Sequence, residues 1–262
     1  MIMDYNFHTH TYRCGHAEGQ DEEYVLRAIK NGIKELGFSD HIPLLYPDGY
    51  QAGYRVKVET LNDYFSSLNS LKEKYKDKID IQIGFECEYF EELFEEMLEK
   101  AIDWGTEYLI LGQHFFHPEH SGNPRAVHVA LQPNDASLLE EYAESIVKAI
   151  KTGKFSYVAH PDMFNFEGDK KTYQQIMRKI CVASKEYNIP LEINLLGIQG
   201  KRIYPNPDFW EVVAEEKSPV TFGCDAHTPL SVYNQDAVTK AEQLVERFAL
   251  NYIGKSNLIL LK

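Results

Sequence analysis

Two short motifs near opposite ends of the chain place metal-binding residue types two positions apart. One is His8-Thr9-His10 and the other is Asp225-Ala226-His227. Side chains two residues apart on a β-strand point to the same face, so each motif offers two ligands to one ion if it ends a strand. A single His-x-His motif is weak evidence for a metal site. Two such pairs in one chain favour metal binding more strongly.

Further histidines and carboxylates follow other apolar runs that we expect to be strands. They are His41, Glu86, His114 and His160, while the sixth predicted strand contains Glu192 and Asn194. In β/α barrels the active site lies at the carboxyl ends of the strands, so these side chains should meet there. Gathering so many imidazoles and anions in one place is costly unless cations bind them. Histidine and carboxylate ligands without cysteine suit Zn²⁺, Mn²⁺ or Fe²⁺, and do not choose among them.

The elements that must position these residues alternate between short apolar runs and longer segments with helical spacing. This alternation predicts parallel strands joined by helices in an α/β fold, and the length is within the range of one domain. Strands are expected at residues 5–10, 35–41, 80–88, 107–115, 156–162, 190–195 and 219–227, and helices at 22–31, 58–76, 91–104, 135–153, 172–187, 207–217 and 236–250, with a short terminal strand at 257–261.

The ordered set of these residues resembles the polymerase and histidinol phosphatase (PHP) family. The segments Glu192-Ile193-Asn194, Arg202-Ile203-Tyr204-Pro205 and Gly223-Cys224-Asp225-Ala226-His227 are similar to those of the histidinol-phosphate phosphatases within it. The positions that carry the wider resemblance, in chain order, are His8, His10, His16, His41, Glu86, His114, His160, Asp225 and His227.

The resemblance implies a fold, an activity and a metal cluster. The fold would be a distorted (β/α)7 TIM-like barrel, a single domain over residues 1–262. The activity would be a phosphatase acting on a small phosphate monoester, L-histidinol phosphate in histidine biosynthesis. The cofactors would be three divalent ions (Zn, Mn or Fe), with His8, His10, Glu86 and Asp225 on the first, Glu86, His114 and His160 on the second, and His16, His41 and His227 on the third.

The catalytic hypothesis is an in-line attack on phosphorus by a hydroxide that bridges the first two ions. Glu86 is the expected bridging ligand, and Asp225 is a candidate for orienting the attacking water. The leaving alkoxide needs a proton, for which His117 and Asp162 are the candidate donors.

Three arginines are candidates for binding the phosphate. Arg202 follows the sixth strand, and a guanidinium offers a bidentate clamp to phosphate oxygens. Arg55 and Arg125, on the long loops 41–57 and 116–134, are further candidates.

Composition restricts the partners. The chain has 27 Lys and Arg against 40 Asp and Glu, a formal charge of −13, which disfavours nucleic acid and favours a small substrate. The four cysteines form no CxxC pair, so we expect reduced, buried thiols. The N-terminus has no signal-like pattern and no stretch is long and apolar enough to cross a bilayer, so a cytoplasmic protein without a membrane partner is expected. The oligomeric state stays open.

Two alternatives from other classes remain. The same family ligands also serve nucleases and nucleotide phosphoesterases, which the charge and the lack of a polymerase domain disfavour. The second alternative is a structural or sensory metal site that binds ions without turnover. The ligands do not form a closed cysteine cage of the kind found in structural sites, which makes this alternative the weaker one.

Overall fold

Strands and helices alternate along the computed structural model, which describes residues 3–120, 123–131 and 134–262. The strands are β1 (Tyr5–Asn6), β2 (Glu35–His41), β3 (Asp80–Cys87), β4 (Tyr108–Leu111), β5 (Phe155–Val158), β6 (Leu191–Asn194), β7 (Pro219–Gly223) and β8 (Asn251–Tyr252). The helices are α1 (Asp21–Lys30), α2 (Leu61–Tyr75), α3 (Phe94–Trp104), α4 (Ala136–Lys151), α5 (Lys170–Tyr187), α6 (Leu195–Gly200), α7 (Pro207–Glu216) and α8 (Gln235–Phe248), with short 3₁₀ helices η1 (Tyr12–Cys14), η2 (Val58–Thr60), η3 (Val129–Leu131) and η4 (Pro229–Val232).

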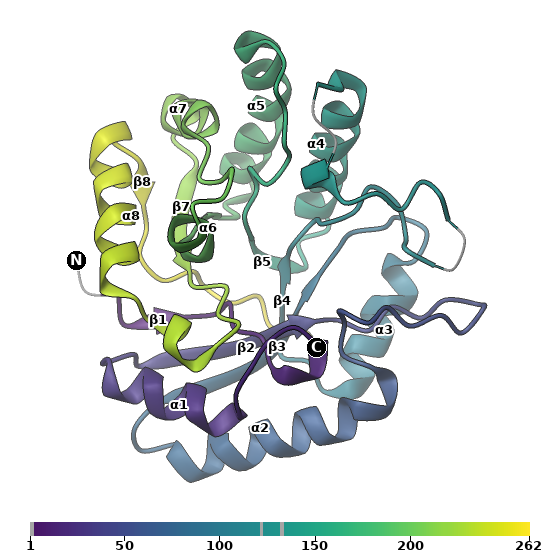
Figure 1. The fold of residues 1–262 in the computed structure, drawn as a ribbon, viewed down its shortest axis with the longest axis vertical. Helices are drawn as coiled ribbons and strands as arrows, with labels where there is room; N and C mark the ends of the chain where they lie inside the picture. Colours follow the sequence, from purple (N-terminus) through teal and green to yellow (C-terminus); the bar gives the residue numbers. More distant parts are fainter. Residues whose placement is uncertain (1–2, 121–122, 132–133) are drawn as a thin grey trace.

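The strands of the described residues form one parallel sheet in the order β1 to β8. Figure 1 shows this sheet curling with helices around its outside. The segments that follow β1 and β7 meet at an isolated parallel bridge between Thr9 and Ala226. There His10 N donates to Ala226 O at 2.9 Å, and Ala226 N donates to His8 O at 3.1 Å. The expected α/β TIM-like fold is confirmed, and the strands' carboxyl ends face one common mouth.

Helix boundaries follow from local capping. The Asp135 carboxylate accepts hydrogen bonds from the backbone of Ser137 and Leu138 at the start of α4, and Asp169 accepts from Thr172 N at the start of α5. These side chains satisfy backbone N–H groups that have no partner within the helix. Helix α3 ends at Gly105, where φ is 90°, a left-handed conformation that glycine adopts without steric cost.

The two motif-bearing strands are shorter than predicted. β1 ends at Asn6 and β7 at Gly223, so their histidines and aspartate lie in irregular segments just beyond the strands. The Asn6 amide oxygen explains part of this change, because it accepts hydrogen bonds from His8 N at 3.1 Å and Cys224 N at 3.0 Å. A side chain has thus replaced part of the strand ladder between the two segments.

The eighth strand of the sheet is not at the predicted place. β8 pairs with β7, whereas the expected terminal strand at 257–261 is wrong: Leu260 makes an isolated antiparallel bridge with Tyr108. The short helix α6 after β6 was not predicted, because six residues give too little periodicity to recognise. Cys14, Cys87, Cys181 and Cys224 are free and buried, as expected. Across the described residues, no helix combines the length and apolar character needed to span a bilayer.

The barrel interior includes a hydroxyl that joins three segments. Tyr108 is fully buried, and its hydroxyl donates to the carbonyls of Phe7 at 2.9 Å and Phe38 at 3.2 Å. Gly37 makes the room, since a Cβ there would overlap the Tyr108 oxygen.

We predict that Tyr108→Phe lowers the free energy of unfolding by about 1–2 kcal/mol, because buried carbonyls lose their shared donor. Urea denaturation of the protein measures this change. Tyr187→Phe, at a tyrosine 41% exposed on α5, is the matched control and should leave the midpoint unchanged. Equal midpoints for both variants would contradict the role of the Tyr108 hydroxyl.

Candidate metal centre

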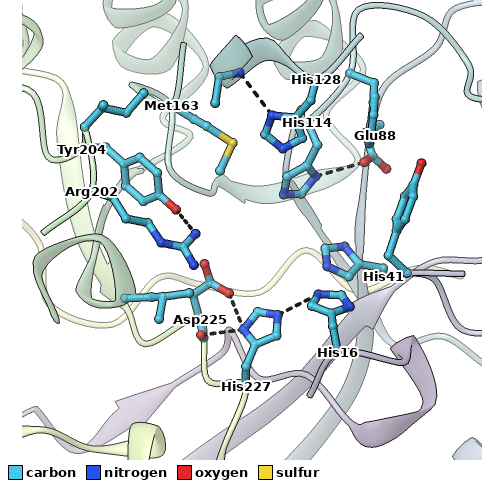
Figure 2. Close-up of a pocket in the computed structure, with 15 residues that line it drawn as sticks. His16, His41, Glu88, His114, His128, Met163, Arg202, Tyr204, Asp225 and His227 are labelled. Atoms are coloured by element: carbon cyan, nitrogen blue, oxygen red, sulfur yellow. Dashed lines mark hydrogen bonds and ion pairs between the residues drawn. The ribbon is translucent and has the colours of Figure 1, made fainter. Parts of the chain in front are cut away.

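A cavity of about 680 Å³ opens at the carboxyl ends of the strands, and ligand-type side chains from distant parts of the chain line it. Figure 2 shows His16, His41, His114, Asp225 and His227 directed toward one another around this cavity. Their convergence follows from the parallel sheet, which brings every strand's carboxyl end to the same mouth.

Glu86, at the end of β3, lies at the centre of the cluster and is 1% exposed. Its Oε1 is 2.9 Å from His160 Nε2, 3.5 Å from His8 Nε2 and 3.6 Å from His114 Nε2. Its Oε2 is 3.1 Å from His41 Nδ1 and 3.6 Å from His10 Nε2. The carboxylate therefore presents one oxygen to each of two groups of imidazoles, which is the arrangement a bridging ligand requires.

Asp225 provides a second carboxylate beside the first pair of histidines. Its Oδ1 is 3.2 Å from His10 Nε2 and 3.6 Å from His8 Nε2, and 3.3 Å from His227 Nδ1. The backbone at Asp225 has φ 50°, a conformation rare outside glycine that Asp and Asn tolerate best. This strained residue turns the carboxylate into the cavity directly after β7.

Several buried polar atoms of the cluster lack hydrogen-bond partners. They include His8 Nε2, His10 Nε2 and Glu86 Oε2. Buried polar atoms without partners are rare and need an explanation. Two imidazole nitrogens and a carboxylate oxygen that face the same space are satisfied together by a cation, so the residues present fit a metal ion.

Carboxylates behind the histidines fix which nitrogen faces the cluster. His8 Nδ1 lies 2.9 Å from Glu192 Oε1, and His114 Nδ1 lies 2.9 Å from Glu88 Oε1. His10 Nδ1 lies 3.4 Å from Asp40 Oδ1. Each carboxylate takes the proton-bearing Nδ1 of its ring and leaves Nε2 free to bind a metal.

Sequence reasoning missed Glu88 and Asp40, although each is close to a predicted ligand in the chain. Asp40 directly precedes His41, and Glu88 lies two residues after Glu86. Glu192, noted as a ligand-type residue of the sixth strand, lies behind His8 instead of among the residues that line the cavity. For Glu88 and Asp40, the signal that could have revealed them was their position within two residues of a predicted ligand.

All nine predicted ligands converge, but the geometry does not divide them among ions in a single way. The groups whose ligand atoms lie within 4.8 Å of one another include His8 with His10 and Asp225, which are three of the four residues expected on the first ion. Others differ from the expected sets and share members: His10, His41 and His227; His8, Glu86 and His160; His41, Glu86 and His114; His10, Cys14 and Asp40. His16 joins through its Nε2, 3.1 Å from His227 Nε2. The assignment of ligands to three ions stays a prediction.

The cluster is strongly polarised. Burial lowers the pKa of His8, but the carboxylates of Glu192, Asp225 and Glu86 outweigh it and raise the pKa to about 10. Burial likewise raises the pKa of Glu86, but the neighbouring histidines outweigh it and hold the pKa well below its usual value. The buried carboxylates therefore have to be neutralised by positive charge within the cluster. Protons on the histidines or bound metal ions supply that charge.

Arg202 is the predicted phosphate clamp that does line the cavity. It is exposed, and its Nη1 donates to the hydroxyl of Tyr204 at 2.8 Å. Figure 2 shows both side chains on the wall near Asp225. Tyr204 is a cavity residue that sequence reasoning did not assign.

Arg55, in contrast, is not placed to clamp phosphate. It is 3% exposed and pairs with Glu88 at 2.7 Å and with Glu119, whose other oxygen accepts from the Tyr46 hydroxyl at 3.0 Å. Its guanidinium neutralises two buried carboxylates, and one of these holds His114. Arg55, on one long loop, thus connects His114, a predicted ligand, to Glu119 on the other.

Arg125 and His117 are also outside the metal cavity. His117 Nε2 lies 3.1 Å from Glu141 Oε1, and Arg125, whose side chain is 70% exposed, is 4.0 Å from the same oxygen. Both line a separate cavity of about 350 Å³ with Tyr46. The structure therefore does not bring these two predicted residues to the ligands.

Asp162 is buried beside the metal cavity without lining it. Its Oδ2 accepts hydrogen bonds from Asn206 N at 2.6 Å and from Trp210 Nε1 at 2.9 Å. Burial raises its pKa to about 7. These bonds anchor the segment that carries Arg202 and Tyr204, a positioning role that differs from the predicted proton donation.

Comparison with known proteins agrees with this geometry. A family model described as PHP domain matches residues 6–195. The chain is 28% identical over 226 residues to a probable histidinol-phosphatase of Deinococcus radiodurans, covering 85% of each, and 26% identical over 259 residues to one of Schizosaccharomyces pombe, covering 88% of this chain and 82% of that protein.

A solved structure shares the fold. It is the histidinol phosphate phosphatase of Lactococcus lactis complexed with zinc, L-histidinol and phosphate, with a TM-score of 0.71, 19% identity and coverage of 100% of both chains. At this identity the likeness is one of fold.

We predict that Gly112→Ala displaces Glu86 and lowers the bound metal content, because a Cβ at Gly112 would overlap the Glu86 carboxylate. Elemental analysis after dialysis measures the metal. Gly53→Ala is the control, since a Cβ there meets nothing within 4 Å. Full metal content in Gly112→Ala would show that the Glu86 position is not needed for binding.

A second prediction separates the two roles of Asp162. Asp162→Asn keeps an oxygen that accepts both hydrogen bonds, so kcat/KM should stay within about threefold of the parent, whereas Asp162→Ala should lose about tenfold as the Arg202 segment loosens. Phosphatase kinetics give the comparison. A similarly large loss of kcat in both variants would instead support proton donation by Asp162.

Proposed function

This chain belongs to the PHP domain family, and from that membership we propose that it hydrolyses a small phosphate monoester, L-histidinol phosphate, to L-histidinol and phosphate with three divalent ions. The observation that carries the proposal is the set of partnerless buried atoms, His8 Nε2, His10 Nε2 and Glu86 Oε2, which face one another at the barrel mouth. Two relatives that match most of the chain's length are named probable histidinol-phosphatases, which supports the choice of substrate.

The protein's own residues would hold the ions and the substrate. Glu86 reaches two groups of histidines and is suited to bridge two ions, and Asp225 joins His8 and His10. Divalent ions at such a site lower the pKa of water and neutralise the charge of phosphoryl oxygens, whichever of Zn, Mn or Fe is bound. Arg202 lines the same cavity, which supports our proposal that it binds a phosphate oxygen.

The cavity favours a small substrate. Its volume of about 680 Å³ lies within the range of small-molecule sites, and the net charge of −13 opposes a long polyanion. A nucleotide or short dinucleotide is the alternative substrate class.

The test is steady-state kinetics of metal-reconstituted protein on monoesters and diesters that include histidinol phosphate, AMP and a dinucleotide. We expect the highest kcat/KM for histidinol phosphate. Glu86→Gln should lower it by about 10³ or more, as several kcal/mol of charge stabilisation are lost, and Glu99→Gln, exposed on α3, should not. A preference for the dinucleotide or AMP would overturn the substrate assignment, and metal binding without turnover of any ester would overturn the phosphatase.

A further inference from the structure

Three aromatic side chains, one in the loop 41–57 and two in or directly before the loop 116–134, form one wall of the metal cavity. We call Tyr54, Phe115 and His128 the aromatic wall; all three line the cavity. Tyr54 and Phe115 stack with ring centroids 5.6 Å apart and an interplanar angle of 17°, and Phe115 meets His128 edge-on at 5.3 Å. The wall therefore presents a continuous aromatic surface.

The aromatic wall begins directly beside the metal-binding residues. The rings of His128 and His114 are 6.1 Å apart, and Val129 N donates to His114 O at 2.9 Å. Figure 2 shows His128 next to His114, with Met163 between these rings and Tyr204 in this view. A phosphate held at the metal centre would therefore extend its alcohol portion along this wall.

The His128 ring has a defined tautomer. Its Nδ1 accepts a hydrogen bond from Ala130 N at 3.1 Å. A nitrogen that accepts carries no proton, so the ring is neutral and its proton is on Nε2. The ring thus offers a single N–H donor.

Buried charges hold the wall in place. Tyr54 precedes Arg55, whose guanidinium carbon is 5.7 Å from the Tyr54 ring centroid and which pairs with Glu119 on the other loop. An antiparallel bridge joins Phe115 and His128. The three residues of the wall are therefore held in place before a ligand binds, which reduces the entropy lost on binding.

We propose that the aromatic wall is the subsite for the leaving alcohol and selects a flat heteroaromatic ring, with His128 Nε2–H donating to an unprotonated ring nitrogen. The neutral imidazole of histidinol has one such nitrogen. Met163 and Leu196 supply apolar surface elsewhere in the cavity, so the bound ring packs against aromatic and apolar side chains. This proposal rests on the proposed function and names the part of the site that recognises the alcohol.

The experiment compares three monoesters with the same amino-alcohol phosphate: histidinol phosphate, phenylalaninol phosphate, which has a ring without nitrogen, and alaninol phosphate, which has no ring. His128→Asn keeps an acceptor for Ala130 N but loses the Nε2 donor. It should raise KM about three- to tenfold for histidinol phosphate alone, the effect of one hydrogen bond. His128→Gln has a side chain one methylene longer, which carries its amide N–H farther out toward the position of Nε2, so it should restore part of that loss.

Phe115→Leu tests the surface separately from the donor. It should raise KM about three- to tenfold for both ring-bearing esters and leave alaninol phosphate unchanged. Tyr187→Leu, far along α5 and 41% exposed, is the control for loss of an aromatic ring and should change none of the three.

Binding of L-histidinol in the presence of phosphate, measured by calorimetry, gives a readout that needs no turnover. His128→Asn should weaken it by the same factor as KM. Unchanged binding, or equal losses on all three esters, would overturn the wall as a specificity subsite. Failure of the proposed function appears in the parent protein as a preference for AMP or diesters, whereas failure of the subsite appears only between variants.

Discussion

The buried charge around Glu86 is the constraint on which the rest of the site depends. A carboxylate that is 1% exposed among five imidazoles cannot keep its charge in a low-dielectric interior without compensating cations. Asp225 adds a second anion beside His8 and His10. The cluster therefore holds protons or metal ions. The pKa of His8 shows the same need for positive charge: burial lowers it, but the neighbouring carboxylates raise it by more.

The need to neutralise buried charge also applies to the carboxylates that hold the histidines from behind. Glu88 holds His114 with one oxygen and Arg55 with the other, and Arg55 also neutralises Glu119. Removing the arginine would leave two buried anions uncompensated, which costs more than the pair contributes when intact. The orientation of His114, a predicted ligand, and the placement of Glu119 thus both depend on the Arg55 guanidinium. Buried charges therefore connect the histidine cluster to the residues beside the aromatic wall.

Much of the site was predictable because metal-ligand residue types recur where parallel strands end, and the barrel brings those ends together. What the sequence could not show arises from contacts between distant residues. The shortened β1 and β7 depend on the Asn6 amide capturing the backbone of Cys224. The burial of Arg55 depends on Glu119, 64 residues away. Neither position carries a local pattern, so Arg55 was predicted as a phosphate-binding residue of a long loop and both strands were predicted to be longer than they are.

The division between strands and loops bears on how this fold discriminates among esters. Predicted ligands such as Glu86 are positioned by strand pairing. Tyr54 and His128 instead lie outside the strands, on two segments that the ion pair between Arg55 and Glu119 joins. Charge at the metal centre acts on the phosphate, which every ester shares, so it contributes binding that is uniform among substrates. Discrimination between alcohols must then come from the loops. We therefore expect a change in loop sequence to alter substrate preference and to leave the metal centre intact, provided that Arg55 and its two carboxylates are retained.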